Sequence, residues 1–154
     1  MIIALPSIRV PIMASTRPSK MPGLRTLKGA RQIFCRVRNT WLQFSAEEFV
    51  RQAYINYLMD VTCVPLGLIQ VEHAFMLHQT VCRFDVVVYN PDKKPWLLVE
   101  LKSPKIKLNQ EVLDQAQRYN LVINAPWLVV SNGLQEVIFY KNIVAKQLEP
   151  FKWN

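Results

Sequence analysis

The chain lacks long hydrophobic runs and has few cysteines. None of its apolar runs approaches the ~20 residues that a membrane-spanning helix needs, although 51% of its 154 residues are hydrophobic. We therefore expect a globular domain with a substantial core and no membrane association. The three cysteines are widely spaced and odd in number, so they imply no disulfide framework and favour a reducing, cytoplasmic compartment.

Zinc-ligand and nucleotide-binding motifs are also missing. The two histidines, His73 and His78, do not combine with cysteines at zinc-ligand spacing. We expect both to lie on or beside a strand rather than to bind metal. No GxxxxGK[ST] segment is present, so nothing in the sequence suggests ATP hydrolysis.

Acidic residues are absent from residues 1–46. This part carries eight Lys or Arg residues, whereas residues 47–154 hold eleven basic and eleven acidic ones, so the net charge of +8 belongs to the first third. A basic arm on a neutral domain suggests a polyanionic partner, most often nucleic acid. Two alternatives stay open: a disordered tail added by an upstream start codon, and a mitochondrial-type targeting peptide, against which the prolines from Pro6 to Pro22 argue.

The hydrophobic pattern predicts an α/β domain at 31–154, preceded at 1–30 by a Pro-rich arm that is extended or disordered. Ser45 and Asn109 are the expected helix N-caps, and Glu48 stands where a capping box needs it. A small hairpin is expected at residues 32–37 and 40–44, followed by a helix at 46–59 and three strands at 68–76, 82–89 and 97–102. A second helix at 109–122 and two strands at 127–130 and 135–140 complete the order. This order is typical of a central mixed sheet flanked by helices.

The most informative residues are Asp85, Glu100 and Lys102, which interrupt two otherwise apolar strands. The strands flank a turn at residues 90–95, so they predict a hairpin. Asp85 and Glu100 lie equally far from the midpoint of this turn, and a symmetric register makes them cross-strand neighbours with Cβ atoms ~5 Å apart. Because side chains alternate along a strand, Lys102 shares a face with Glu100.

Two facing carboxylates repel each other as anions, and a divalent cation removes that repulsion. Oxygen ligands are typical of Mg²⁺ or Mn²⁺, which acidify a bound water and neutralise charge that develops on a phosphate. Lys102 beside such a metal can orient the water or stabilise the phosphorus centre. The structural alternative is a salt bridge from Lys102 to Asp85 or Glu100, and for the three residues together we favour the functional interpretation.

Asp85 followed by Glu100-Leu101-Lys102 resembles the signature of the PD-(D/E)XK nuclease superfamily. Gln115 and Tyr119 on the next predicted helix fit the Q-x-x-x-Y pattern of its RecB-like members, and their spacing puts them on one helical face. The proline that names the superfamily is Phe84 here, which is a minor departure.

The amino-acid sequence around these motifs resembles more closely the N-terminal nuclease domain of type I restriction enzyme motor subunits. Small stand-alone bacterial proteins also carry that domain. The similarity spans about residues 31–141. It implies a restriction-endonuclease-like core with αβββαβ order and a nuclease that uses Mg²⁺ or Mn²⁺ to cut DNA.

The resemblance also implies a role for each matching residue. Asp85 and Glu100 would bind the metal together with the Leu101 carbonyl, and Lys102 would assist the attacking water. Gln115 would position Lys102 or the phosphate, with Tyr119 supporting it. An acid of the first helix often completes such sites, and Glu48 is the candidate, with Glu47 as the alternative.

DNA is therefore the expected partner, and we keep two other functions open. One is a nucleic-acid-binding module that does not cut. The other is a nuclease subunit that needs a partner motor protein, since the sequence contains no motor domain. A homodimer or partner interface could use Trp127, Phe151, Trp153 and the apolar strand at 134–140, although ordinary core is the favoured interpretation of these residues.

Overall fold

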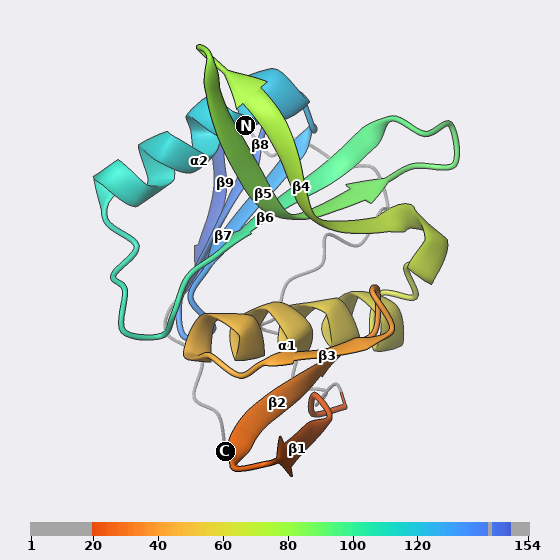
Figure 1. Ribbon diagram of the computed structural model, residues 1–154. Coiled ribbons are helices and arrows are strands. Elements are labelled where there is room, and N and C mark those ends of the chain that lie inside the picture. Colours follow the sequence, from red (N-terminus) through yellow and green to blue (C-terminus); the bar gives the residue numbers. More distant parts are fainter. Residues whose placement is uncertain (1–19, 142, 149–154) are drawn as a thin grey trace.

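The computed structural model describes residues 20–141 and 143–148 (Figure 1). Their secondary structure consists of two β-sheets, two α-helices and one short 3₁₀ helix. In chain order the elements are β1 (Leu24–Leu27), β2 (Ala30–Cys35), β3 (Thr40–Gln43), α1 (Ala46–Asp60), η1 (Leu66–Leu68), β4 (Ile69–Leu77), β5 (Thr80–Tyr89), β6 (Pro95–Leu101), α2 (Gln110–Ile123), β7 (Trp127–Ser131), β8 (Glu136–Tyr140) and β9 (Ile143–Leu148).

The larger sheet has six strands in the order β4-β5-β6-β7-β8-β9, so every strand lies beside its neighbour in the chain. All pairs are antiparallel except β6 and β7, which run parallel and are joined by α2 as a crossover helix. The predicted class, an α/β fold with a mixed sheet and αβββαβ order, is confirmed and is compatible with a restriction-endonuclease-like fold. Each predicted strand and helix is present within two residues of its expected ends.

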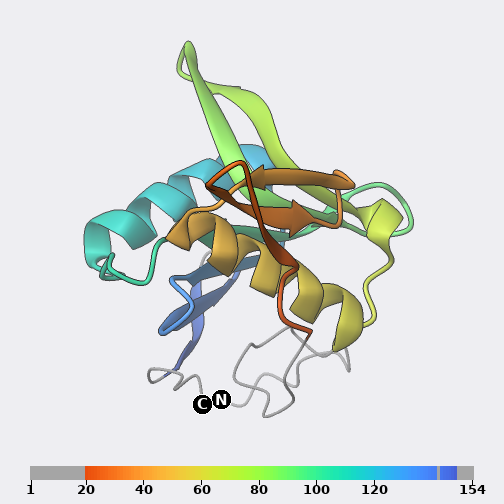
Figure 2. The same cartoon turned by 60° about the horizontal axis from the view of Figure 1, so that its bottom comes forward.

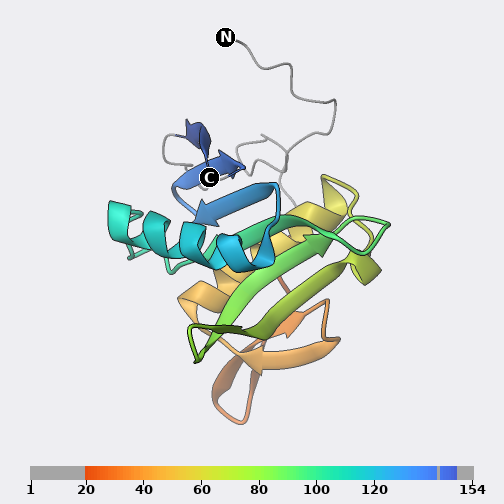
Figure 3. The same ribbon diagram turned by 90° about the horizontal axis from the view of Figure 1, so that it is seen from above.

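The two helices cover opposite faces of this sheet. Leu97, Val99 and Leu101 of β6 pack in a core with α1, whereas Leu98 packs in a second core with Ala116 of α2. Seen from above, α2 and the small sheet lie on opposite sides of the large sheet (Figure 3). The alternation predicted for β6 is therefore confirmed, and it puts Glu100 on the side of the sheet that α2 covers.

The hairpin register also agrees with the prediction. Val86 pairs with Val99 and Val88 with Leu97, which is the symmetric register, and a bulge follows between Val88 and Tyr89. Asn90 closes the turn because its side-chain Oδ1 accepts a hydrogen bond from the Lys94 amide at 2.9 Å. Continuing this register by one residue brings Asp85 opposite Glu100.

Each helix begins at its predicted cap. Ser45 Oγ accepts from the Glu48 amide at 3.0 Å, and Asn109 Oδ1 accepts from the Val112 amide at 3.0 Å. The capping box itself is not formed, because the carboxylate of Glu48 binds Arg51 and Gln52 rather than the amide of the cap residue.

The smaller sheet, β1-β2-β3, packs on α1 and precedes it in the chain. Figure 2, in which the bottom of the molecule comes forward, shows these strands beside α1. β2 and β3 form the predicted small hairpin, while β1 lies within the segment that we predicted to be an extended or disordered arm. Residues 1–19 lie outside the described residues, and the division of the chain at residue 30 stays a prediction.

Strand β8 lies between β7 and β9, so it is not the free sheet edge that a partner interface would need. Trp127 is buried, and its ring lies 4.6 Å from that of Tyr140, which agrees with ordinary core. Phe151 and Trp153 lie outside the described residues. No helix in the described part of the chain is both long and apolar enough to cross a membrane.

Candidate functional site

Asp85 and Glu100 meet where β6 ends. Asp85 Oδ2 accepts a hydrogen bond from the Leu101 amide at 2.8 Å, which fixes the carboxylate of β5 against β6. Lys102 follows the last residue of β6, and its amide donates to Ser131 O at 2.9 Å. The backbone pairing with β7 therefore continues one residue past the strand and holds Lys102 beside the two acids.

Glu100 is the most constrained acid of this group. It is 5% exposed, and its Oε1 is buried with no hydrogen-bond partner among the described residues. Burial raises the pKa of Glu100 well above the usual carboxylate range, and the charge of Asp85 raises it further, while Lys102 acts in the opposite direction. A buried acceptor without a donor is costly, so this oxygen is suited to a cation.

Lys102 is half-buried and has no ion pair among the described residues. The structural alternative, a salt bridge from Lys102 to Asp85 or Glu100, is therefore not formed. Asp85 does have a cationic partner, but the partner is Arg51 of α1, whose Nη2 lies 2.6 Å from Asp85 Oδ1.

Arg51 is a site residue to which the sequence analysis assigned no role. Its guanidinium is buried, and it pairs with Asp85, with Glu48, with Glu72 at 3.0 Å and with Glu47 at 3.3 Å. Its spacing from the two acids of α1, three and four residues, is a signal that could have been read from the sequence. The contacts to β4 and β5 could not, because they depend on how α1 packs on the sheet.

Both acids of the first turn of α1 face this cluster. Glu48, the predicted candidate, is buried and binds Arg51 as well as Gln52, whose Nε2 lies 2.7 Å from Glu48 Oε1. Glu47, the alternative, is more exposed. Burial and the charge of Asp85 raise the pKa of Glu47, and Arg51 and Lys102 lower it, so Glu47 lies within electrostatic range of the site.

Gln115 and Tyr119 share a face of α2, as predicted. Gln115 Nε2 donates to Tyr119 Oη at 3.1 Å. Burial raises the pKa of Tyr119, a hydrogen bond with Cys82 of β5 raises it further, and the charge of Glu100 also contributes. This pair therefore faces the sheet on the side where Glu100 lies.

The site contains two adjacent carboxylates, those of Asp85 and Glu100, and the Leu101 carbonyl stays a predicted further ligand. Within residues 20–141 and 143–148, no group of three or more His, Cys, Asp or Glu side chains is arranged to hold a metal ion. A two-carboxylate set with water in the other positions is nevertheless a common arrangement for Mg²⁺. The unpartnered Oε1 of Glu100 next to Asp85 fits such an ion.

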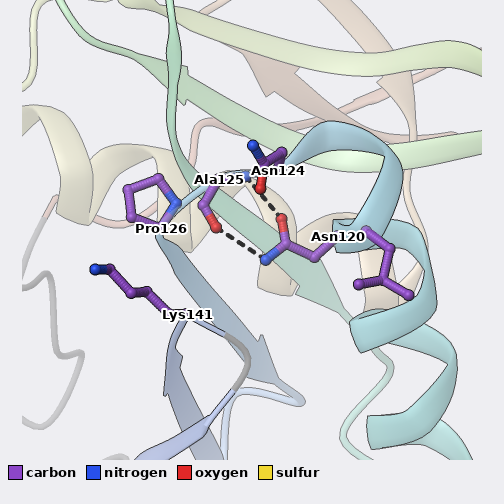
Figure 4. Close-up of a pocket in the computed structure, with 6 residues that line it drawn as sticks. Asn120, Asn124, Ala125, Pro126 and Lys141 are labelled. Carbon is purple, nitrogen blue, oxygen red and sulfur yellow. Dashed lines mark hydrogen bonds between the residues drawn. The ribbon is translucent and has the colours of Figure 1, made fainter.

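A cavity of about 480 Å³ lies elsewhere, where α2 ends and β7 begins (Figure 4). Asn120 closes this end of the helix, since its side chain accepts from the Ala125 amide at 3.0 Å and donates to Ala125 O at 2.9 Å. Of the described residues that line it, Lys141 alone is charged. The cavity lies beside Pro126, before β7, whereas Lys102 pairs with Ser131 at the other end of that strand, so it is not part of the acidic site.

Comparisons with known proteins give one family. The family model described as type I restriction enzyme R protein N terminus (HSDR_N) matches residues 46–152. No curated protein and no solved structure matches the chain significantly. The matched segment starts at the first residue of α1 and includes Asp85, Glu100 and Lys102, and it covers well over half of the chain. The chain therefore belongs to the family of the type I restriction enzyme R protein N terminus, which gives it a nuclease-related role.

Proposed function

We propose that this protein is a metal-dependent nuclease that hydrolyses phosphodiester bonds in DNA, with a site of the PD-(D/E)XK type. The observation that carries the proposal is the meeting of Asp85 and Glu100 with Lys102 at the end of β6. Glu100 is buried with an oxygen that no described residue binds, and Lys102 has no acidic partner there. Asp85 pairs with Arg51, but no ion pair among the described residues neutralises Glu100 or Lys102, so their arrangement favours chemistry.

Asp85, Glu100 and the Leu101 carbonyl are the groups that would hold Mg²⁺ or Mn²⁺. When bound, such an ion acidifies a coordinated water and neutralises charge on the phosphate. Asp85 is held for this task from two sides, since the Leu101 amide binds one oxygen and Arg51 binds the other. Each oxygen keeps a second lone pair for a further ligand.

Lys102 would act on the attacking water and the phosphate. An ammonium group without a carboxylate partner can donate hydrogen bonds to a phosphate oxygen and can orient the water. Gln115 lies on the α2 face turned toward Glu100, and it would help to position Lys102 or the phosphate. Tyr119 supports Gln115 through their hydrogen bond.

Arg51 would serve as a positioning residue for Asp85. Its guanidinium offsets the repulsion between Asp85 and the acids of α1 and β4, and so holds these carboxylates close together. Glu48 or Glu47 would complete the site from the first turn of α1. The charges of both Asp85 and Lys102 act on the Glu47 carboxylate. This proximity favours Glu47 over Glu48 for direct contact with substrate or water.

The family is named after an R protein of a larger restriction enzyme, so a partner motor protein is a second element of the proposal. The 154 residues carry no P-loop motif, so nothing in them suggests the ATP hydrolysis that drives DNA translocation. Cleavage of short DNA needs no translocation, so it can be tested with this chain alone.

The deciding experiment incubates the purified protein with single-stranded, duplex and branched DNA in Mg²⁺, in Mn²⁺ and in EDTA. We expect cleavage that depends on metal and is lost in Lys102→Ala. Binding of Mn²⁺, measured by electron paramagnetic resonance, should be lost in Asp85→Asn and kept in Lys102→Ala. Salt-sensitive DNA binding with no cleavage in either metal would instead favour the non-cutting module.

A further inference from the structure

The β1–β2 hairpin is an exposed ribbon at the edge of the small sheet. All four residues of β1 are exposed, and so are Ala30 and Arg31 where β2 begins. Leu27 pairs with Ala30 across a two-residue turn, in which Lys28 and Gly29 both have positive φ. This is the geometry of a tight type I′ hairpin turn, which matches the twist of the strands that it joins. In Figure 1, β1 lies at the bottom, on the far side of the small sheet from the large one.

The ribbon carries a basic residue on each face and one at its tip. Arg25 pairs across the strands with Gln32, so Arg31, the next residue along, points to the opposite face. The guanidinium of Arg25 lies over the Trp41 ring at 4.2 Å, and that of Arg31 lies over the Phe44 ring at 4.3 Å. These stacking contacts hold both side chains in place while leaving them exposed.

Other arginines of this region have structural partners. Arg36 pairs with Asp60 at 2.9 Å, and Arg38 pairs with Glu72, so these two fasten the small sheet to α1 and β4. No described carboxylate pairs with Arg25, Lys28 or Arg31. Residues 20–45 contain no acid at all, so the charge of the ribbon is not balanced locally.

We propose that the β1–β2 ribbon lies in a groove of duplex nucleic acid and contacts phosphates on both sides of it. A two-stranded antiparallel ribbon has the width that the major groove of DNA admits. A flat basic surface would contact one strand of phosphates, but basic side chains on both faces of a ribbon suit phosphates on two sides. Lys28 is exposed in the turn at the tip of the ribbon, the part that would enter such a groove first.

The ribbon is placed to work with the acidic site. β3 pairs with β2 and runs directly into α1, whose first turn carries Glu47 within electrostatic range of Asp85 and Lys102. The inference rests on the proposed function only for the choice of nucleic acid as the polyanion. The ribbon lies before the segment that the family model matches, which begins at the first residue of α1.

Binding without cleavage separates this inference from the nuclease proposal. The full chain is titrated onto a fluorescent 20-base-pair duplex in EDTA at several salt concentrations. For Arg25→Gln/Lys28→Gln/Arg31→Gln we expect at least tenfold weaker binding near 0.1 M salt, and a salt slope reduced by about 2 to 3, since each phosphate contact contributes roughly 0.9. The matched control, Lys93→Gln/Lys94→Gln/Lys141→Gln, removes the same charge from exposed positions outside the small sheet and should leave the slope unchanged.

A charge-preserving variant guards against a folding artefact. Arg25→Lys/Arg31→Lys should keep most of the salt slope, and circular dichroism should show unchanged melting for every variant used. Equal losses in the triple variant and its control would overturn the ribbon as the contact. An equal effect on single-stranded DNA would refute the groove geometry, and equally tight binding of poly-glutamate would replace nucleic acid by an acidic protein partner.

Discussion

The two sheets of this protein differ in where their charged side chains lie and in whether these side chains are paired. In the large sheet, Asp85 and Glu100 form a largely buried cluster with Arg51 of α1, which packs on that sheet. In the small sheet, Arg25 and Arg31 stay exposed on aromatic rings and have no carboxylate partner among the described residues. Buried charges of both signs are suited to catalysis, whereas exposed charges of one sign are suited to attracting a polyanion.

One carboxylate joins the two regions. Glu72 of β4 binds Arg38, which belongs to the small sheet's β2–β3 turn, and also binds Arg51, which in turn binds Asp85. The small sheet is therefore attached to the acidic cluster through side chains as well as through α1. Substitutions in the acidic cluster, in the small sheet or at Glu72 can test this difference between the two regions.

Lys102→Ala should give the largest effect. Removing the ammonium group deprives the water and phosphate of their donor, so DNA cleavage should fall by about 10²–10⁴-fold, while melting and DNA binding in EDTA change little. Rates are compared with those of Lys105→Ala, an exposed lysine three residues on, which should cut normally. Equal activity in the two variants would show that Lys102 has no part in the chemistry.

Arg51→Ala should have the largest effect on stability. It leaves the carboxylates of Glu47, Glu48, Glu72 and Asp85 without their shared cation, and removing one partner of a buried ion pair costs about 3–5 kcal/mol. Urea unfolding measures the loss, with Arg118→Ala on the exposed side of α2 as the control.

Arg51→Lys keeps the charge but loses the planar fork, and it should recover part of the stability. This variant also supplies the measurement if Arg51→Ala does not fold. Full stability in Arg51→Ala would contradict the central place of Arg51 in the cluster.

Glu100→Gln should stabilise the metal-free protein. The folded state raises the pKa of Glu100 above its unfolded value, so stability falls as pH rises past the ordinary value of 4.5, and an amide removes that penalty. At neutral pH in EDTA the gain should be about 1–3 kcal/mol. Mn²⁺ should raise the melting temperature of the wild type but not of Glu100→Gln, and a drop in stability in EDTA would count against the buried charge.

The smallest expected effect concerns the junction at Glu72. Burial disfavours its ionisation, but the hydrogen bond from Arg38 and the charge of Arg51 outweigh burial and lower the pKa of Glu72 below the ordinary 4.5. Its contribution to stability is therefore present above that value and is lost as pH falls through the lower, folded value.

Unfolding measured between about pH 6 and pH 3 should show this loss in the wild type and not in Glu72→Gln. Glu111→Gln, at an exposed position of α2, is the control and should retain the wild-type profile. Identical profiles for Glu72→Gln and wild type would mean that the junction contributes nothing.

Much of the fold and the centre of the site could be predicted from the sequence. Alternation along β6 and the symmetric turn were sufficient to bring Asp85 next to Glu100 and to leave Lys102 beside them. These relations are local, because a hairpin fixes its own register and a strand fixes its own faces.

Longer-range contacts escaped prediction. From the sequence alone, a basic residue in a helix is expected to face solvent. Arg51 is instead buried, because α1 is covered over most of its length and because acids of β4 and β5 surround the guanidinium. Strand β1 was missed for a different reason. It is four residues long, carries no buried side chain to create alternation, and is defined mainly by the Lys28-Gly29 turn.

The linear strand order has a consequence for folding. Because every strand of the large sheet pairs with its chain neighbour, most pairings close short loops, and only the β6–β7 pair must wait for the α2 crossover. Asp85 and Glu100 belong to the short β5–β6 hairpin. We therefore expect the two acids to be brought together early in folding, before α1 supplies the arginine that balances them.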